Sequence, residues 1–118
     1  MQHTQSFMDL VQDALKTVPE VTVEQVKDLL EAHHHFALID VREESEFAMN
    51  RLPHAVHLSR GIIEIKIEQV IPNKETEIVL YCGGGNRSAL SAQNLQKMGY
   101  KNVKSMKGGF RAWAAMVG

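Results

Sequence analysis

Short apolar runs alternate with helical patterns along most of this 118-residue chain. Residues 36–41 and Ile78–Tyr81 are two such runs, and each is apolar with little polar alternation. This pattern is typical of strands that are buried on both faces of a sheet. Helical patterns between the strands imply right-handed crossovers and a mainly parallel sheet. The sequence therefore predicts an α/β fold of three layers, in which helices cover both faces of a sheet of about five strands.

Turn and capping residues set the expected boundaries of these elements. Pro19 stops a leading helix, and a capping box at Thr22–Gln25 opens the next one. Gly99 ends a later helix. We assign no element to the isoleucine-rich segment 61–71. The expected helices are residues 5–18, 22–33, 43–49, 88–99 and the segment from Gly108 onward; the expected strands are residues 36–41, 55–58, 78–81 and 102–105.

The length and composition predict one main domain with a helical extension before it. We place the extension at residues 1–19 and the domain at residues 20–118. Hydrophobic residues make up 44% of the chain, and the pI near 6.6 gives no basic surface for nucleic acid. The sequence has no apolar run of the roughly 20 residues that a membrane helix needs, and no signal-peptide pattern, so we expect a cytoplasmic location.

The single cysteine, Cys82, directly follows the predicted strand Ile78–Tyr81 and precedes a glycine loop and a helical pattern. This order places the sulfur at the carboxyl end of a strand, where open α/β sheets bind ligands. Glycines permit dihedral angles that a Cβ would forbid, so consecutive N–H groups can surround one anion. The helix dipole and Arg87 favour the thiolate form. We predict Cys82 as the nucleophile, with a substrate-binding loop of Gly83, Gly84, Gly85, Asn86, Arg87 and Ser88.

Each of these residues also has a simpler interpretation. A free cysteine at a strand end is often a small buried hydrophobic residue, but such a residue needs no converging amides. A lone cysteine excludes an internal disulfide and a zinc site built from several thiolates. Asp40 and Arg42 are predicted to support neighbouring loops rather than to catalyse. Consecutive histidines at 33–35 cannot share one helix face, so we predict no metal site there.

Three blocks of sequence together resemble the single-domain rhodanese family, a sulfurtransferase module. The first block is 38–43 with Glu46 and Phe47, the second is Tyr81–Ser88, and the third is 99–103 with Gly108, Gly109 and Trp113. The resemblance covers roughly residues 20–117 in order and spacing. The middle block departs from it, because residues 50–55 read Asn-Arg-Leu-Pro-His-Ala where the family usually has Gly-His-Ile-Pro-Gly-Ala.

The resemblance implies a thiosulfate sulfurtransferase that works by double displacement. Cys82 would attack the outer sulfur of a donor such as thiosulfate, release sulfite and become a persulfide. A thiol, cyanide or a partner protein would then accept the sulfur, because no second cysteine can resolve the persulfide. The reaction needs no metal and no organic cofactor. Arg87 has two candidate roles, which are to hold the loop by hydrogen bonds and to neutralise an anionic donor.

Other functions share parts of this pattern. A persulfide carrier that feeds a partner enzyme, or a regulatory rhodanese-like module, would use the same fold. Cysteine phosphatases and arsenate reductases also hold a cysteine in an amide loop followed by an arginine. Their signature has five residues between the two, whereas Cys82 and Arg87 enclose four. The shorter loop favours sulfur over phosphate as the bound group.

Overall fold

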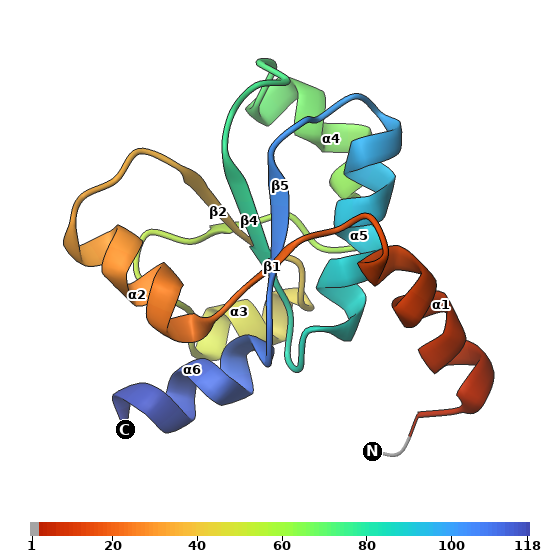
Figure 1. The fold of residues 1–118 in the computed structure, drawn as a ribbon. Helices are drawn as coiled ribbons and strands as arrows, with labels where there is room; N and C mark the ends of the chain where they lie inside the picture. Colours follow the sequence, from red (N-terminus) through yellow and green to blue (C-terminus); the bar gives the residue numbers. More distant parts are fainter. Residues whose placement is uncertain (1–2) are drawn as a thin grey trace.

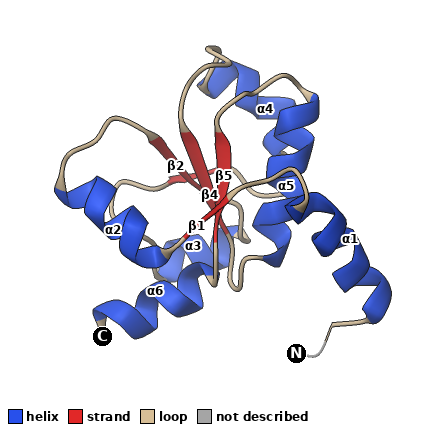
Figure 2. Ribbon diagram, viewed as in Figure 1, coloured by secondary structure: helices blue, strands red, loops and turns tan. Residues whose placement is uncertain are grey.

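The computed structural model describes residues 3–118 as a parallel sheet between helices (Figures 1 and 2). Neighbouring strands follow the order β1-β5-β4-β2-β3, and every pair is parallel. The strands are β1 (Glu20–Val21), β2 (Ala37–Asp40), β3 (Val56–His57), β4 (Ile78–Tyr81) and β5 (Val103–Met106). The helices are α1 (Gln5–Leu15), α2 (Val23–Glu31), α3 (Glu44–Met49), α4 (Ile63–Val70), α5 (Asn86–Lys97) and α6 (Gly109–Val117). The predicted α/β class with five strands and an N-terminal helix is confirmed.

The central strand β4 divides the hydrophobic core into two halves. All four of its residues are buried, and alternate side chains point to opposite faces of the sheet. Leu80 belongs to the core beneath α4 and α5, whereas Val79 and Tyr81 belong to the core beneath α2 and α6. Burial on both faces explains why this strand reads as a continuous apolar run. The carboxyl end of β4 therefore emerges from the centre of the sheet.

The leading helix α1 packs on the domain through α5 (Figure 1). Val11 and Ala14 are fully buried against Ala89 and Leu90 of α5. The apolar side of α1 is therefore covered by this chain itself. The proposed division of the chain at residue 19 stays a prediction.

Two elements appear where none was assigned. β1 has only two residues, and it pairs with β5 at the far end of the sequence in the register Glu20↔Ser105. The isoleucine-rich segment contains α4, which buries Ile63 and Ile67 four positions apart and leaves Ile65 73% exposed. This spacing gives one buried helix face. Within residues 3–118, the helices lack the length and apolar character needed to cross a bilayer.

Candidate active site

The loop between β4 and α5 turns sharply at one glycine. Cys82 follows β4 directly, and α5 begins at Asn86. Gly85 has φ +99°, a left-handed conformation that favours glycine. Gly83 and Gly84 do not have positive φ values, so the expectation of unusual dihedral angles at all three glycines is corrected to Gly85 alone. A single left-handed residue is enough to turn the chain from the strand into the helix.

The sulfur of Cys82 accepts main-chain hydrogen bonds from two residues of this turn. The N–H of Gly85 lies 3.1 Å from Sγ, and the N–H of Ser88 lies 3.4 Å from it. Both bonds stabilise negative charge on the sulfur. Cys82 itself is only 1% exposed. The sulfur is therefore held at the floor of a pocket, with converging amides rather than with aliphatic neighbours alone.

Two serine hydroxyls lie behind the sulfur. The Oγ of Ser88 is 3.5 Å from Sγ and 2.8 Å from the Oγ of Ser105, and it donates to the carbonyl oxygen of Gly85 at 3.2 Å. Ser88 and Ser105 are both fully buried. Because a hydroxyl can rotate, Ser88 can also direct its proton toward a negatively charged sulfur. Ser105 was not predicted as a site residue, because its only signal is a serine inside a buried strand.

The start of α6 fixes the same loop from the other side. The N–H of Phe110 donates to the carbonyl oxygen of Cys82 at 2.7 Å, and the N–H of Arg111 donates to that of Gly83 at 3.1 Å. Gly109 makes this approach close: a Cβ there would overlap the Cys82 carbonyl oxygen and lie 2.7 Å from the carbonyl carbon of Gly83. Two N–H groups of the first turn of α6, which have no acceptor within the helix, thus hold the loop carbonyls in place.

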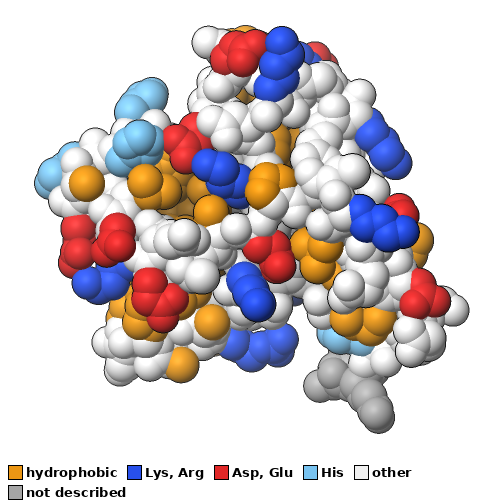
Figure 3. Space-filling view, in the orientation of Figure 1, with side chains coloured by type: hydrophobic (Ala, Val, Ile, Leu, Met, Phe, Trp, Pro, Cys, Tyr) orange, Lys and Arg blue, Asp and Glu red, His pale blue; other side chains and the backbone are white. Residues whose placement is uncertain are grey.

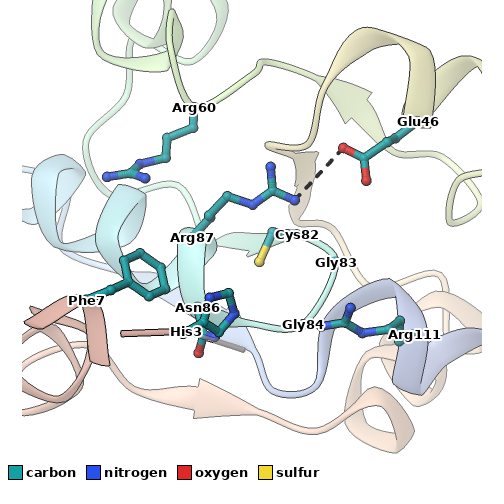
Figure 4. Close-up of a pocket in the computed structure, with 10 residues that line it drawn as sticks. All are labelled: His3, Phe7, Glu46, Arg60, Cys82, Gly83, Gly84, Asn86, Arg87 and Arg111. Atoms are coloured by element: carbon teal, nitrogen blue, oxygen red, sulfur yellow. Dashed lines mark ion pairs between the residues drawn. The ribbon is translucent and has the colours of Figure 1, made fainter. Parts of the chain in front are cut away.

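A pocket of about 500 Å³ opens above the sulfur (Figure 4). Four residues of the predicted loop line it, namely Gly83, Gly84, Asn86 and Arg87. Gly85 and Ser88 are not part of the lining, and their N–H groups donate hydrogen bonds to the sulfur. The lining comes from α1 and His3 before it, α3, the β3–α4 connection, the β4–α5 loop, the start of α5, and α6. The lining residues are His3, Phe7, Glu46, Arg60, Cys82, Gly83, Gly84, Asn86, Arg87 and Arg111.

Three arginines and one glutamate give the pocket a positive balance of charge. The guanidinium of Arg87 lies 3.9 Å from the carboxylate of Glu46. The guanidinium of Arg111 lies over Gly84, where a Cβ would overlap it. The absence of a side chain at Gly84 therefore makes room for a cation that comes from α6. Arg60 and Arg111 were not predicted as site residues, because their place in the pocket of Cys82 depends on the tertiary fold.

Asp40 and Arg42 form a buried ion pair at the end of β2, apart from the pocket lining. The Nη2 of Arg42 lies 2.7 Å from Asp40 Oδ2, and its Nε lies 3.0 Å from Oδ1. Arg42 also donates to the carbonyl oxygen of Asn50, after α3. Burial lowers the pKa of Arg42, but the hydrogen bonds and charge of Asp40 outweigh it, and the pKa is raised. The pair ties the β2–α3 connection to the sheet.

Among residues 3–118, no group of three or more histidine, cysteine, aspartate or glutamate side chains is placed to hold a metal ion. His34 instead contacts the carboxylate of Glu77 at 2.8 Å.

The surface between α1 and α6 is visibly hollowed in the space-filling view (Figure 3). Lys or Arg side chains lie on its α6 side, and apolar and histidine side chains lie on its α1 side. The two sides of the hollow thus differ in chemical character.

Comparison with known proteins agrees with this architecture. The family model of the rhodanese-like domain matches residues 22–116. The chain belongs to the rhodanese-like domain family. It is 36% identical over 96 residues to the Bacillus subtilis (strain 168) protein "Putative sulfurtransferase YtwF". The match covers 81% of this chain and 90% of that protein. It is 30% identical over 97 residues, or 82% of the chain, to "Putative sulfur carrier protein YrkF" of the same strain, and spans 51% of that protein.

One solved structure matches the chain over its whole length, including the α1 segment that lies outside the family model. This is RPA3614 of Rhodopseudomonas palustris CGA009, described as a protein of unknown function and "Possible Tyrosine Phosphatase". The two chains are 26% identical, with a TM-score of 0.90, and the match covers 100% of this chain and 96% of that one. The packing of α1 beside a rhodanese-like domain therefore has a counterpart in a second protein.

Proposed function

We propose that this protein is a sulfurtransferase that carries sulfane sulfur as a persulfide on Cys82. The single observation that supports this most directly is the sulfur itself, which accepts N–H hydrogen bonds from Gly85 and Ser88 at the floor of an arginine-lined pocket. N–H groups directed at a sulfur can stabilise the charge of a thiolate when it acts as a nucleophile. The arginines provide attraction for an anionic donor and for the anion that leaves.

The reaction proposed for thiosulfate is a displacement at sulfur. The Cys82 thiolate attacks the outer sulfur, the S–S bond of thiosulfate breaks, and its electron pair leaves with sulfite. The product is a Cys82 persulfide anion, which the amides of the loop can stabilise as they do the thiolate. An external thiol, cyanide or a protein then removes the outer sulfur, because the chain has no other cysteine.

The direct test is the mass of the intact protein after incubation with thiosulfate. We expect a product heavier by one sulfur atom, which returns to the starting mass when cyanide is added and thiocyanate forms. Cys82→Ser is the matched control, because it keeps a hydrogen-bonding atom at this position but removes the nucleophile. A folded wild-type protein that gains no sulfur would contradict the proposed function.

Two alternative functions predict different results in the same samples. A sulfur carrier would form the persulfide but release it slowly to small acceptors and faster to a partner protein. A cysteine phosphatase would release phosphate from a chromogenic phosphate ester in a Cys82-dependent manner. Phosphatase turnover without persulfide formation would replace our proposal with that second function.

A further inference from the structure

The N-terminal helix reaches into the pocket that contains Cys82. Phe7 of α1 lines the pocket together with His3, although both are far from Cys82 in the sequence. Phe7, Val11 and Ala14 share one face of the helix because they are spaced by four and three residues. Val11 and Ala14 are buried against α5, and the half-buried ring of Phe7 continues this face over the pocket. Packing of α1 on α5 thus determines where the ring lies.

The two sides of the pocket suit different parts of a ligand. In Figure 4, Phe7 and Arg111 lie on opposite sides of Cys82, and Arg87 lies close to the sulfur. The ring of Phe7 also contacts that of His3, with centroids 4.9 Å apart. Arginine and main-chain N–H groups suffice to bind a small inorganic anion. An aromatic wall adds affinity only if the ligand also has an apolar or aromatic part.

The size of the pocket points the same way. A volume of about 500 Å³ lies within the range of about 300–1,000 Å³ that is usual for pockets binding organic ligands. Thiosulfate is a small inorganic ion and would leave most of this space to water. The aromatic side of the pocket would then have no contact with the donor.

We propose that α1 forms a specificity wall and that the preferred sulfur donor is an anionic sulfane-sulfur compound with an apolar organic group, which packs on Phe7. This inference rests on the proposed function, because it assigns the donor of that same reaction. An aryl thiosulfonate anion has this chemistry. The Cys82 thiolate attacks its outer sulfur, the S–S bond breaks, and the electron pair leaves with the aryl sulfinate. One negative charge stays on the Cys82 persulfide, and the other leaves with the sulfinate, so charge is conserved.

The test compares benzenethiosulfonate with thiosulfate as donor and cyanide as acceptor. For each protein, kcat/KM is measured with both donors, and the rate with Cys82→Ser is subtracted. We expect Phe7→Ala to lower the benzenethiosulfonate-to-thiosulfate ratio of kcat/KM by about two- to tenfold, the range expected when one aromatic contact is lost. The loss should fall mainly on benzenethiosulfonate.

Leu15→Ala is the matched control variant. Leu15 packs in the same α1–α5 cluster as Phe7 but does not line the pocket, so the donor ratio should stay at the wild-type value. An equal loss with both donors in Phe7→Ala, or the same change of ratio in Leu15→Ala, would overturn the specificity wall. If Phe7→Ala fails to fold, Phe7→Gln decides the question, because its methylene groups can still contact α5 while its amide removes the apolar surface from the pocket. An unchanged ratio in folded Phe7→Gln would then overturn the inference.

The experiment also separates this inference from the proposed function. Wild-type protein that forms no persulfide with either donor would refute the sulfurtransferase proposal itself. Turnover of both donors with a ratio that does not depend on Phe7 would leave that proposal intact and remove only the specificity wall.

Discussion

At the scale of single residues, the site depends on where side chains are missing as much as on where they are present. Gly84 leaves space for the guanidinium of Arg111, and Gly85 supplies the left-handed turn that directs two amides to the sulfur. The opposite case is His54, which has φ +64° although it carries a Cβ. The rhodanese-like family usually has glycine at the position of His54, in the block of residues 50–55. The backbone at His54 still adopts the left-handed conformation that glycine accepts most easily, although the side chain has changed.

The buried ion pair of Asp40 and Arg42 gives a prediction at this scale. Asp40→Asn removes the charge that compensates a buried guanidinium, so we expect the free energy of unfolding to fall by about 3–5 kcal/mol. Chemical denaturation measures this loss. The rate of Cys82 alkylation by iodoacetamide in the folded variant should stay unchanged, because Asp40 does not line the pocket. Exposed Asp28→Asn is the control and should be nearly neutral. Slower alkylation without loss of stability would assign Asp40 to the site instead.

At the scale of elements, the loop that connects β4 to α5 is held in place by the start of a third element, α6. The β4–α5 loop and the first turn of α5 provide the sulfur and its amide donors, and α6 holds the carbonyl groups of the loop through Phe110 and Arg111. The helix therefore has two roles: it covers one face of the sheet, and it fixes the loop from outside. The geometry around the sulfur should be sensitive to any change that moves this helix end.

Gly109 and Gly61 form a matched pair for testing this contact. A Cβ at Gly109 would overlap the loop, and its φ of +59° is unfavourable for alanine, whereas nothing lies within 4 Å of a Cβ at Gly61. We expect Gly109→Ala to lower the melting temperature and the rate of persulfide formation together, by moving α6 away from the loop. Gly61→Ala should change neither quantity. A Gly109→Ala protein with wild-type activity would show that the loop keeps its shape without α6.

An element or site residue is predictable from sequence when its signal lies within its own segment. β2, β4 and α5 were predictable because an uninterrupted apolar run or a glycine turn lies within the segment itself. β1 was not, because its two residues are a strand only by pairing with β5. The same reason applies to the site: Cys82 and its loop are contiguous, whereas Phe7, Arg60 and Arg111 approach the sulfur through packing of distant elements. The roles of the loop residues stay predictions until they are tested by substitution.

At the scale of the whole molecule, one end of the sheet carries the candidate active site and the other carries a cluster of ion pairs. The carboxyl end carries Cys82 and the pocket. Toward the other end, Glu77 precedes β4 and links His34, which lies before β2, to Lys104 of β5, at 2.8 and 3.2 Å. Burial raises the pKa of Glu77, but hydrogen bonds from His34 and Lys104 outweigh it, so the pKa is lowered. This carboxylate therefore joins three parts of the chain away from the site.

The lowered pKa of Glu77 predicts a pH-dependent contribution to stability. A carboxylate with a lowered pKa in the folded state stabilises the protein at pH values above its ordinary pKa of 4.5, and this contribution is lost as the pH falls through the lowered value. We expect Glu77→Gln to be less stable than wild type at neutral pH, with the difference disappearing in acid. Urea unfolding across this pH range measures it. Glu75→Gln is the control, since its ion pair with Lys101 is exposed, and a pH-independent difference for Glu77→Gln would contradict the prediction.

The pairing of the earliest elements with late ones has a consequence for biosynthesis. α1 docks on α5 and β1 on β5, and the hydrogen-bonded pair Thr17 and Gln96 is 79 positions apart. During translation, the first helix leaves the ribosome well before the segments that cover it have been made. Contacts of such long range form late, and the apolar face of α1 stays exposed until α5 is available to cover it. The pocket above Cys82, which α1 helps to line, is therefore among the last features of a newly made molecule to be completed.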